Sequence, residues 1–265
     1  MTVSGTGDKW AVITGASAGI GKECAKVLSA RGYHLVVVAR SLDGLNALKD
    51  ELSANKKQVE VVALDLTLPE APEQLVKITD AKNIIPEVLV NNAGIGCYGR
   101  FLDTKLPDQL RLLRLNVDTL ISLSYLYGAK MRQRKNGYIL QVASTAAFQP
   151  MPNYGLYAAT KSLVLSFSRA LNFESKADGV SSTALCPGAT RTNFFDASKH
   201  TPSKDFERMM MPADAVARAG IDAMFARRDV HVSGLINSFY AFISRLVPAS
   251  VMMRALAKAT ESQST

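Results

Sequence analysis

The stretch Trp10-Ala-Val-Ile-Thr-Gly15-Ala-Ser-Ala-Gly19-Ile-Gly21 decides the fold of this chain. An apolar run leads into closely spaced glycines and a helical pattern from Lys22 to Ala30, which predicts a strand, a tight loop and a helix. Glycines let the backbone approach a pyrophosphate closely, and the free N–H groups at a helix start favour an anion. The spacing is G-x-x-x-G-x-G rather than the common dinucleotide-binding G-x-G-x-x-G. Taken alone, the motif is also compatible with a glycine-rich turn that binds nothing.

Beyond this stretch, apolar runs alternate with helical patterns along the chain. Strands are expected near residues 10, 35, 60, 89, 139, 182 and 231, with helices between them. This alternation predicts an α/β fold in which a seven-stranded parallel sheet carries helices on both faces. With 265 residues and 48% apolar content, the chain can bury one large core, and we expect a single domain spanning 1–265.

Tyr157 and Lys161 form a candidate catalytic pair. They stand four residues apart in a helical pattern, which places them on one face of a helix. An ammonium beside a phenol favours the phenolate, so we expect Lys161 to lower the pKa of Tyr157 and make it a usable acid or base. Tyr154 has the uncharged Ala158 four residues on and gains no such partner. Taken alone, such a pair is more often a surface contact in which the lysine stem covers the ring.

Polar side chains follow two further predicted strands. Asn91 and Asn92 end an apolar run, at a point where amides can hold a ribose or brace neighbouring strands. For Asn92, pinning a turn is as good an interpretation as ligand contact. Ser144 ends the strand predicted near residue 139, and its hydroxyl can hold a substrate oxygen beside Tyr157.

Together these motifs resemble those of the short-chain dehydrogenase/reductase family, and the resemblance runs from about Lys9 to Gly234. The similarity implies a doubly wound Rossmann fold and a hydride transfer between a nicotinamide and a carbonyl or alcohol carbon. The predicted catalytic residues are Asn116, Ser144, Tyr157 and Lys161. The predicted cofactor-binding residues are Gly15, Ser17, Gly19, Ile20, Gly21, Arg40, Ser41, Asp65, Asn91, Ala93, Gly94, Tyr157, Lys161, Pro187, Gly188 and Thr192.

The resemblance also implies a role for each catalytic residue. In the reductive direction, Tyr157 gives its proton to the substrate oxygen while Ser144 hydrogen-bonds that oxygen. Lys161 lowers the pKa of the tyrosine and binds the nicotinamide ribose, and Asn116 holds a water that links the lysine to solvent. Two alternatives are a non-catalytic NADP(H)-binding sensor, which needs no acid/base set, and an epimerase or dehydratase on the same fold, whose relatives are usually longer.

The end of the second predicted strand bears on the cofactor. Arg40 stands there, followed by Ser41, where an acidic residue would hydrogen-bond a ribose 2′-hydroxyl and repel a 2′-phosphate. We therefore predict NADP(H) rather than NAD(H), although Arg40 could merely cap a strand and Ala18 adds no second basic residue to the glycine loop. Asp65, after the third predicted strand, resembles the family's adenine contact, with a helix N-cap before Pro69 as the alternative.

Composition narrows the partners and the location. Three scattered cysteines suit neither a disulfide framework nor a metal cluster, so we expect no metal site and an intracellular, cytoplasmic protein. The start of the chain shows no signal-peptide pattern. The net charge of +8 comes without the basic and aromatic interleaving of nucleic-acid binders, so we expect no nucleic acid partner. The expected partner is a small-molecule carbonyl or alcohol substrate, and the resemblance adds a homodimer or homotetramer formed through the helices near residues 110–127 and 162–173.

Apolar segments on either side of Tyr157 are expected to build the substrate pocket. Segments 96–101, 148–154 and 192–211 are mainly apolar, which predicts a hydrophobic ketone or acyl substrate. Residues 189–211 are predicted to form a substrate lid, with an insertion of no role as the alternative. Residues 235–265 are predicted to form a C-terminal helical extension that covers the pocket and contacts a partner, with peripheral membrane association as the alternative. This tail resembles the branch of hydroxysteroid dehydrogenases and long-chain ketoacyl reductases more than the 3-oxoacyl carrier-protein reductases.

Overall fold

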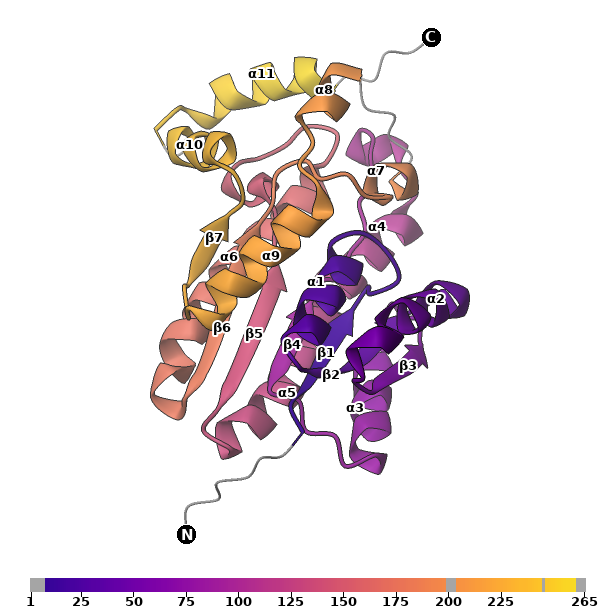
Figure 1. Ribbon diagram of the computed structural model, residues 1–265. Helices are drawn as coiled ribbons and strands as arrows, with labels where there is room; N and C mark the ends of the chain where they lie inside the picture. Colours follow the sequence, from indigo (N-terminus) through magenta and orange to yellow (C-terminus); the bar gives the residue numbers. More distant parts are fainter. Residues whose placement is uncertain (1–7, 199–203, 245, 261–265) are drawn as a thin grey trace.

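A sheet of parallel strands forms the centre of the molecule, and helices cover both of its faces (Figure 1). The computed structural model describes residues 8–198, 204–244 and 246–260. The strands are β1 (Trp10–Thr14), β2 (His34–Ala39), β3 (Val59–Ala63), β4 (Val88–Asn91), β5 (Gly137–Val142), β6 (Val180–Cys186) and β7 (Val230–Val232). Their order across the sheet is β3-β2-β1-β4-β5-β6-β7, and every neighbouring pair is parallel. The predicted α/β fold and its seven-stranded parallel sheet are confirmed.

The helices form two layers, one against each face of the sheet. One layer holds α1 (Gly19–Ala30), α2 (Leu42–Leu52) and α9 (Ala213–Phe225). The other holds α3 (Ala71–Ala81), α5 (Thr119–Gln133) and α6 (Gly155–Ser175). Toward the end of the molecule where the strands finish lie α4 (Leu106–Leu113), α7 (Phe194–Ala197), α8 (Lys204–Met209), α10 (Leu235–Ile243) and α11 (Ala249–Thr260) (Figure 1). Among the described residues, none of the helices has both the length and the apolar character needed to cross a membrane.

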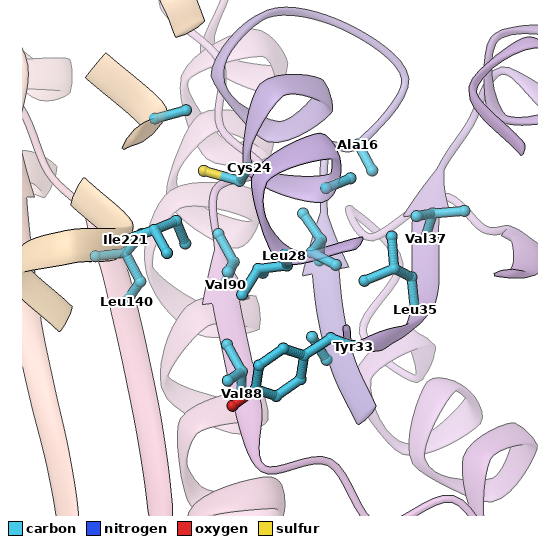
Figure 2. Packing of buried hydrophobic residues seen from close by; sticks show 14 of the residues in the cluster. Ala16, Cys24, Leu28, Tyr33, Leu35, Val37, Val88, Val90, Leu140 and Ile221 are labelled. Atoms are coloured by element: carbon cyan, nitrogen blue, oxygen red, sulfur yellow. The ribbon is translucent and has the colours of Figure 1, made fainter. Parts of the chain in front are cut away.

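The strands are apolar along their length because each face of the sheet packs against its own layer of helices. On β2, Val37 belongs to the first core and Val38 to the second, which is the alternation expected of a strand with two buried faces. Figure 2 shows the first core, in which Leu28 of α1 and Ile221 of α9 belong to the same cluster as Val90 of β4. Burial on both faces makes the sheet a rigid platform for the loops at its carboxyl end.

The order of the strands reverses between β1 and β4. From β1 the chain continues outward through β2 and β3, and from β4 it continues through β5, β6 and β7 in the other direction. In open parallel sheets, such a switch point leaves a crevice at the carboxyl ends of the strands, and ligands bind there. The glycine loop after β1 and the asparagines at the end of β4 flank this point.

Candidate active site

The glycine loop between β1 and α1 has a backbone conformation that depends on glycine. Gly15 and Gly19 have left-handed φ angles of 67° and 55°, which residues with side chains rarely adopt. A Cβ atom on Gly21 would lie 2.3 Å from the carbonyl oxygen of Gly15. At the start of α1, Ala18 provides no side-chain cap, and the first turn holds no acidic residue. The N-terminus of α1 is therefore open to an anion, which fits the pyrophosphate of a dinucleotide.

A groove of about 420 Å³ runs from this loop across the carboxyl ends of β1 to β4. Predicted cofactor-binding positions line it, namely Gly15, Ser17, Arg40, Ser41, Asp65, Ala93 and Gly94. The rest of its lining is apolar and comprises Ala39, Leu64, Leu66, Ile95 and Leu115. Ile20, also predicted, packs its side chain against the core. A few polar groups in an apolar groove at a switch point are typical of a nucleotide site.

Arg40 stands at the rim of this groove. It ends the buried strand β2, and its own side chain is exposed. Ser41 beside it caps α2, because its hydroxyl accepts the N–H of Gly44 at 3.2 Å. Within the described part of the chain, the structure gives Arg40 no ion-pair partner closer than 4 Å, so its guanidinium is available to a phosphate.

Asp65 lies across the groove and is held by its own loop. Its carboxylate accepts hydrogen bonds from the backbone N–H and the hydroxyl of Thr67, at 3.0 and 2.8 Å. Burial alone would raise the pKa of Asp65, but these hydrogen bonds and the charges of Arg111 and Arg40 hold it below its usual value. The alternative role as a helix N-cap is not observed, since α3 begins later, at Ala71. Asp65 is therefore an ionised group in the lining of the groove, and its contact with an adenine stays a prediction.

The side chain of Asn91 braces β4 against its neighbours. Its amide nitrogen donates to the carbonyl of Leu120, the hydroxyl of Ser124 and the side-chain oxygen of Gln141, at 3.3, 3.0 and 3.0 Å. Side chains alternate along β4, and Asn91 shares the face of Leu89, which packs in the second core. The bracing role expected as one alternative is therefore observed for this side chain, and the predicted cofactor contact of Asn91 is left to its backbone.

Asn92 pins the end of β4 to the glycine loop. Its amide nitrogen donates to the carbonyl oxygens of Thr14 and Gly15, at 2.9 and 3.1 Å. The Thr14 hydroxyl accepts the backbone N–H groups of Asn92 and Ala93, each at 3.0 Å. The turn-pinning interpretation of Asn92 is confirmed, and these bonds fix the backbone that leads into Gly94.

Tyr157 and Lys161 lie one turn apart on α6, beside the end of β5. The Lys161 ammonium donates to the carbonyl of Val142 at 2.7 Å and lies 5.7 Å from the centre of the Tyr157 ring. Ser144 follows β5, and its hydroxyl accepts the N–H of Ala146 at 3.1 Å and interacts with the Tyr157 hydroxyl. Three of the four predicted catalytic residues therefore meet at one point.

Asn116 reaches the same point from a wide, π-helical turn, Arg114–Asp118, between α4 and α5. Its side-chain oxygen accepts the N–H of Ile95 at 2.9 Å, and its amide nitrogen donates to the Ile95 carbonyl at 3.0 Å. A Cβ atom on Gly94 would lie 3.2 Å from the side-chain oxygen of Asn116 and 3.5 Å from the ammonium of Lys161. Both polar groups therefore lie against the backbone at Gly94. Turns of this kind often occur at functional sites.

The pKa values of the pair differ from the expectation. Burial raises the pKa of Tyr157 to about 12, although the hydrogen bond with Ser144 opposes the shift. Burial also lowers the pKa of Lys161 to about 8. The predicted lowering of the tyrosine pKa is wrong for the protein alone, because loss of solvent dominates and the Lys161 ammonium is directed at Val142. At neutral pH, Tyr157 therefore carries its proton and can act as an acid.

Aromatic rings surround Tyr157. The ring centres of Tyr154 and Phe194 lie 5.9 and 5.2 Å from that of Tyr157, and Tyr98 lies 5.3 Å from Tyr154. The hydroxyl groups of Tyr154 and Ser198 form a hydrogen bond at 3.2 Å, which links α6 to the end of α7. The sequence indicates the apolar character of this wall, but no motif in it points to the Tyr154–Ser198 bond.

The start of the predicted lid lies directly on the site. Thr192 packs on the glycine loop, since a Cβ atom on Gly19 would lie 2.8 Å from its Cγ2 atom. Phe194 packs on the loop after β4, since a Cβ atom on Gly96 would lie 2.7 Å from its Cζ atom. Residues 199–203 of the predicted lid lie outside the described residues. The described part of this segment therefore bridges the cofactor groove and the aromatic wall.

The turn at Pro187 and Gly188 connects the site to the C-terminal extension. The Pro187 carbonyl accepts the N–H of Thr145 at 2.9 Å, which ties the turn to the loop after β5. A Cβ atom on Gly188 would lie 2.4 Å from the amide nitrogen of Asn237 on α10, and that nitrogen donates to the Ser233 carbonyl at 2.7 Å. Asn237 could not be identified from the sequence, because it belongs to no motif. Folding alone brings it against Gly188, 49 residues earlier in the chain.

Residues 9–203 match the family model described as short chain dehydrogenase. This chain belongs to the short-chain dehydrogenase family. Members of the family are oxidoreductases that act on alcohol or ketone groups with a nicotinamide cofactor. The open helix N-terminus, the groove and the polar cluster at Tyr157 fit such a cofactor.

Similar proteins include several of distinct function. The "Probable oxidoreductase EphD" of Mycobacterium tuberculosis is 30% identical to this short-chain dehydrogenase over 244 residues, which are 91% of this chain and 40% of that protein. Human "17-beta-hydroxysteroid dehydrogenase type 3" is 33% identical over 189 residues, 69% of this chain and 60% of that protein. Mouse "Very-long-chain 3-oxoacyl-CoA reductase" is 28% identical over 236 residues, 87% of this chain and 75% of that protein. The chain thus spans less than two thirds of the first two relatives.

Solved structures extend the likeness over nearly the whole chain. A short-chain dehydrogenase from Sphingobium yanoikuyae in complex with NADPH has a TM-score of 0.79 and 29% identity, covering 92% of this chain and 94% of that one. The "bulky-bulky ketone specific alcohol dehydrogenase" from Comamonas testosteroni has a TM-score of 0.77 and 26% identity, covering 97% and 96%. The predicted Rossmann fold of this short-chain dehydrogenase is confirmed.

Proposed function

We propose that this chain is an NADP(H)-dependent oxidoreductase that transfers a hydride between the nicotinamide and a carbonyl or secondary alcohol of a hydrophobic substrate. The observation that carries the proposal is the meeting of Ser144, Tyr157, Lys161 and Asn116 beside the glycine-loop groove. A positioned acid next to a dinucleotide site is what carbonyl reduction requires. A protein that only senses the cofactor needs none of these groups.

In the reductive direction, the nicotinamide supplies the hydride that the carbonyl carbon receives. Tyr157, protonated because burial raises its pKa to about 12, donates its proton to the carbonyl oxygen, and the product is the alcohol. The Ser144 hydroxyl donates a hydrogen bond to the same oxygen and fixes its position. Lys161, charged below its pKa of about 8, stabilises the phenolate left on Tyr157. Asn116 fixes the adjoining backbone, and the water relay expected there stays a prediction.

The preference for NADP(H) rests on Arg40. Its exposed guanidinium at the rim of the groove can form paired hydrogen bonds with a ribose 2′-phosphate. Asp65, the acidic residue in the groove lining, has its carboxylate engaged by Thr67. The dehydrogenase from Sphingobium yanoikuyae, which has a bound NADPH, adds support.

The substrate class rests on the wall around the acid. Tyr98, Tyr154 and Phe194 form an aromatic chain with Tyr157, and Phe195 packs edge-on against Phe194. Such a wall favours an apolar substrate, since aromatic rings bury large areas without charge. The relatives named for hydroxysteroids, long-chain acyl groups and bulky ketones agree with this chemistry. We propose a bulky hydrophobic ketone, or its secondary alcohol, as the substrate.

We also propose a single domain, with residues 189–211 as a substrate lid and 235–265 as a C-terminal helical extension. The contacts of Phe194 with Tyr157 and of Asn237 with Gly188 support this division.

A homodimer or homotetramer is the proposed assembly. Support comes from large apolar side chains exposed on the outer faces of α5 and α6, namely Tyr125, Leu163 and Phe173. Free cysteines, two of them buried, support the proposed cytoplasmic location.

The proposal is tested by following NADPH and NADH oxidation across aliphatic, aromatic, steroid and acyl-thioester ketones. We expect NADPH to be preferred, and bulky hydrophobic ketones to exceed short polar carbonyls in kcat/KM by about tenfold or more. Turnover of short polar carbonyls only would contradict the substrate class. NADPH binding without turnover of any ketone would favour the sensor.

A further inference from the structure

Helix α10 presents its large apolar side chains to solvent. Leu235, Phe239 and Phe242 are 89, 68 and 58% exposed and stand at positions i, i+4 and i+7, which form one stripe along a helix. Ile236 beside them is 78% exposed. Amphipathic helices of water-soluble proteins normally turn such a stripe inward, so this stripe requires an explanation.

The opposite face of α10 is polar or small and faces the protein. Asn237 donates to the Ser233 carbonyl and packs on the Gly188 turn. The hydroxyl of Tyr240 accepts a hydrogen bond from the side-chain amide of Gln149. Ala241, one residue further on, is buried. The hydrogen bonds of Asn237 and Tyr240 and the burial of Ala241 therefore fix the orientation of α10. In this orientation the apolar stripe faces solvent.

Charge distinguishes the possible occupants of this face. Helices α10 and α11 contain no aspartate or glutamate, and α11 contains Arg254 and Lys258. The Arg254 side chain is exposed on α11. In a two-fold pairing of this face with a second copy, α10 and α11 of the partner would offer these basic groups no acidic residue. An anionic lipid surface supplies both the apolar layer and the opposite charge.

We propose that the outer face of α10, with α11 beside it, docks on the surface of a bilayer that contains anionic phospholipids. Phe239, Phe242 and Leu235 enter the boundary between headgroups and acyl chains, and Arg254 contacts the headgroup phosphates. At nine residues, α10 is about 14 Å long and lies in the interface instead of crossing a hydrocarbon core of about 30 Å.

Docking through α10 would place the active site close to the lipid. The inner face of this helix contacts both the Gly188 turn and Gln149, so one helix separates the site from the bilayer. A hydrophobic ketone dissolved in the membrane could then reach the pocket without crossing water. This route for the substrate rests on the proposed function, whereas the docking itself does not.

The test is flotation of the full chain with vesicles of phosphatidylcholine and phosphatidylglycerol in equal amounts, and with phosphatidylcholine vesicles alone. We expect binding to the mixed vesicles at low salt that weakens at high salt. The double variant Ile236→Ser, Phe239→Ser should partition at least about tenfold less, since it removes two apolar side chains from the contact. The matched control is Leu68→Ser, Ile85→Ser, which removes two apolar side chains at exposed positions elsewhere and should bind like the wild type.

Folding and catalysis are followed in the same variants by thermal unfolding and by NADPH turnover of a water-soluble ketone. Loss of vesicle binding with unchanged unfolding would support docking even if no ketone is turned over. A wild type that ignores the mixed vesicles at low salt would overturn it. So would a fall in oligomer mass in the α10 variant without any vesicle binding, which would assign the face to a second copy.

Discussion

Lys161 is buried, whereas its proposed role requires a positive charge, so its titration should be visible in the activity. Burial lowers its pKa from the usual 10.5 to about 8, so its ammonium loses its proton as the pH rises through that value. Tyr157, with a pKa raised to about 12, keeps its proton throughout the same range. We therefore predict that kcat/KM for ketone reduction falls as the pH rises above about 8, because the phenolate formed on Tyr157 loses its stabilising charge.

The pH profile is measured with saturating NADPH, and circular dichroism at each pH separates loss of activity from unfolding. A profile that stays flat up to the ordinary lysine pKa of 10.5 would show that Lys161 is not the group that titrates.

We propose that Arg40 determines the preference for NADP(H) over NAD(H). For Arg40→Ala we predict a rise in the KM for NADPH of about 10- to 100-fold, since a charge-assisted contact to the 2′-phosphate is lost. The KM for NADH should change little. Arg218→Ala, at an exposed position on α9, removes the same charge away from the groove and serves as the control. Equal changes for both cofactors in Arg40→Ala would contradict the assignment.

The loop between β1 and α1 shows how closely a short element can depend on glycine. For Gly21→Ala we predict a loss of stability of about 1–3 kcal/mol, because the added Cβ would overlap the Gly15 carbonyl. The control is Gly155→Ala at the start of α6, where a Cβ would have no atom within 4 Å. Thermal unfolding of the two variants measures the difference. Similar stability in both would mean that the loop is not tightly packed.

Several elements could be predicted from the sequence because their signals are local. The seven strands were identifiable from apolar runs, and the glycine loop from its spacing. The side-chain direction of Asn91 could not be predicted from the sequence, because it depends on which face of β4 packs against α5. The raised pKa of Tyr157 was also missed, since sequence spacing shows a neighbouring charge but not the loss of solvent around it.

Helix α10 was predictable as a helix but not in its orientation. Its apolar residues suggested a pocket cover, whereas the structure turns Asn237 and Tyr240 inward and Phe239 outward. That orientation is set by Gly188 and Gln149, which lie far away in the sequence. Such contacts between distant segments leave no recognisable pattern in a single sequence.

At the scale of the whole molecule, exposed apolar side chains on α5 and α6 predict self-association. Tyr125 is exposed on the outer face of α5, and Leu163 is exposed on α6. We predict a mass in solution of two or four times the 28.6 kDa chain, measured by light scattering after size exclusion. Tyr125→Arg should lower that mass, because it places a charge in an apolar contact, whereas Leu68→Arg, an exposed position before α3, should not. A monomeric wild type would contradict this prediction.

The central claim is that Tyr157 is the acid of a hydride-transfer enzyme, and a comparison of two tyrosines tests it most directly. Tyr157→Phe and Tyr154→Phe each remove one hydroxyl from rings whose centres are 5.9 Å apart. NADPH affinity is measured by fluorescence and ketone turnover by nicotinamide absorbance in both variants. We predict that Tyr157→Phe binds NADPH but loses about 10²- to 10⁴-fold in kcat, whereas Tyr154→Phe mainly raises KM through loss of its bond to Ser198. Turnover by Tyr157→Phe close to that of the wild type would contradict the account.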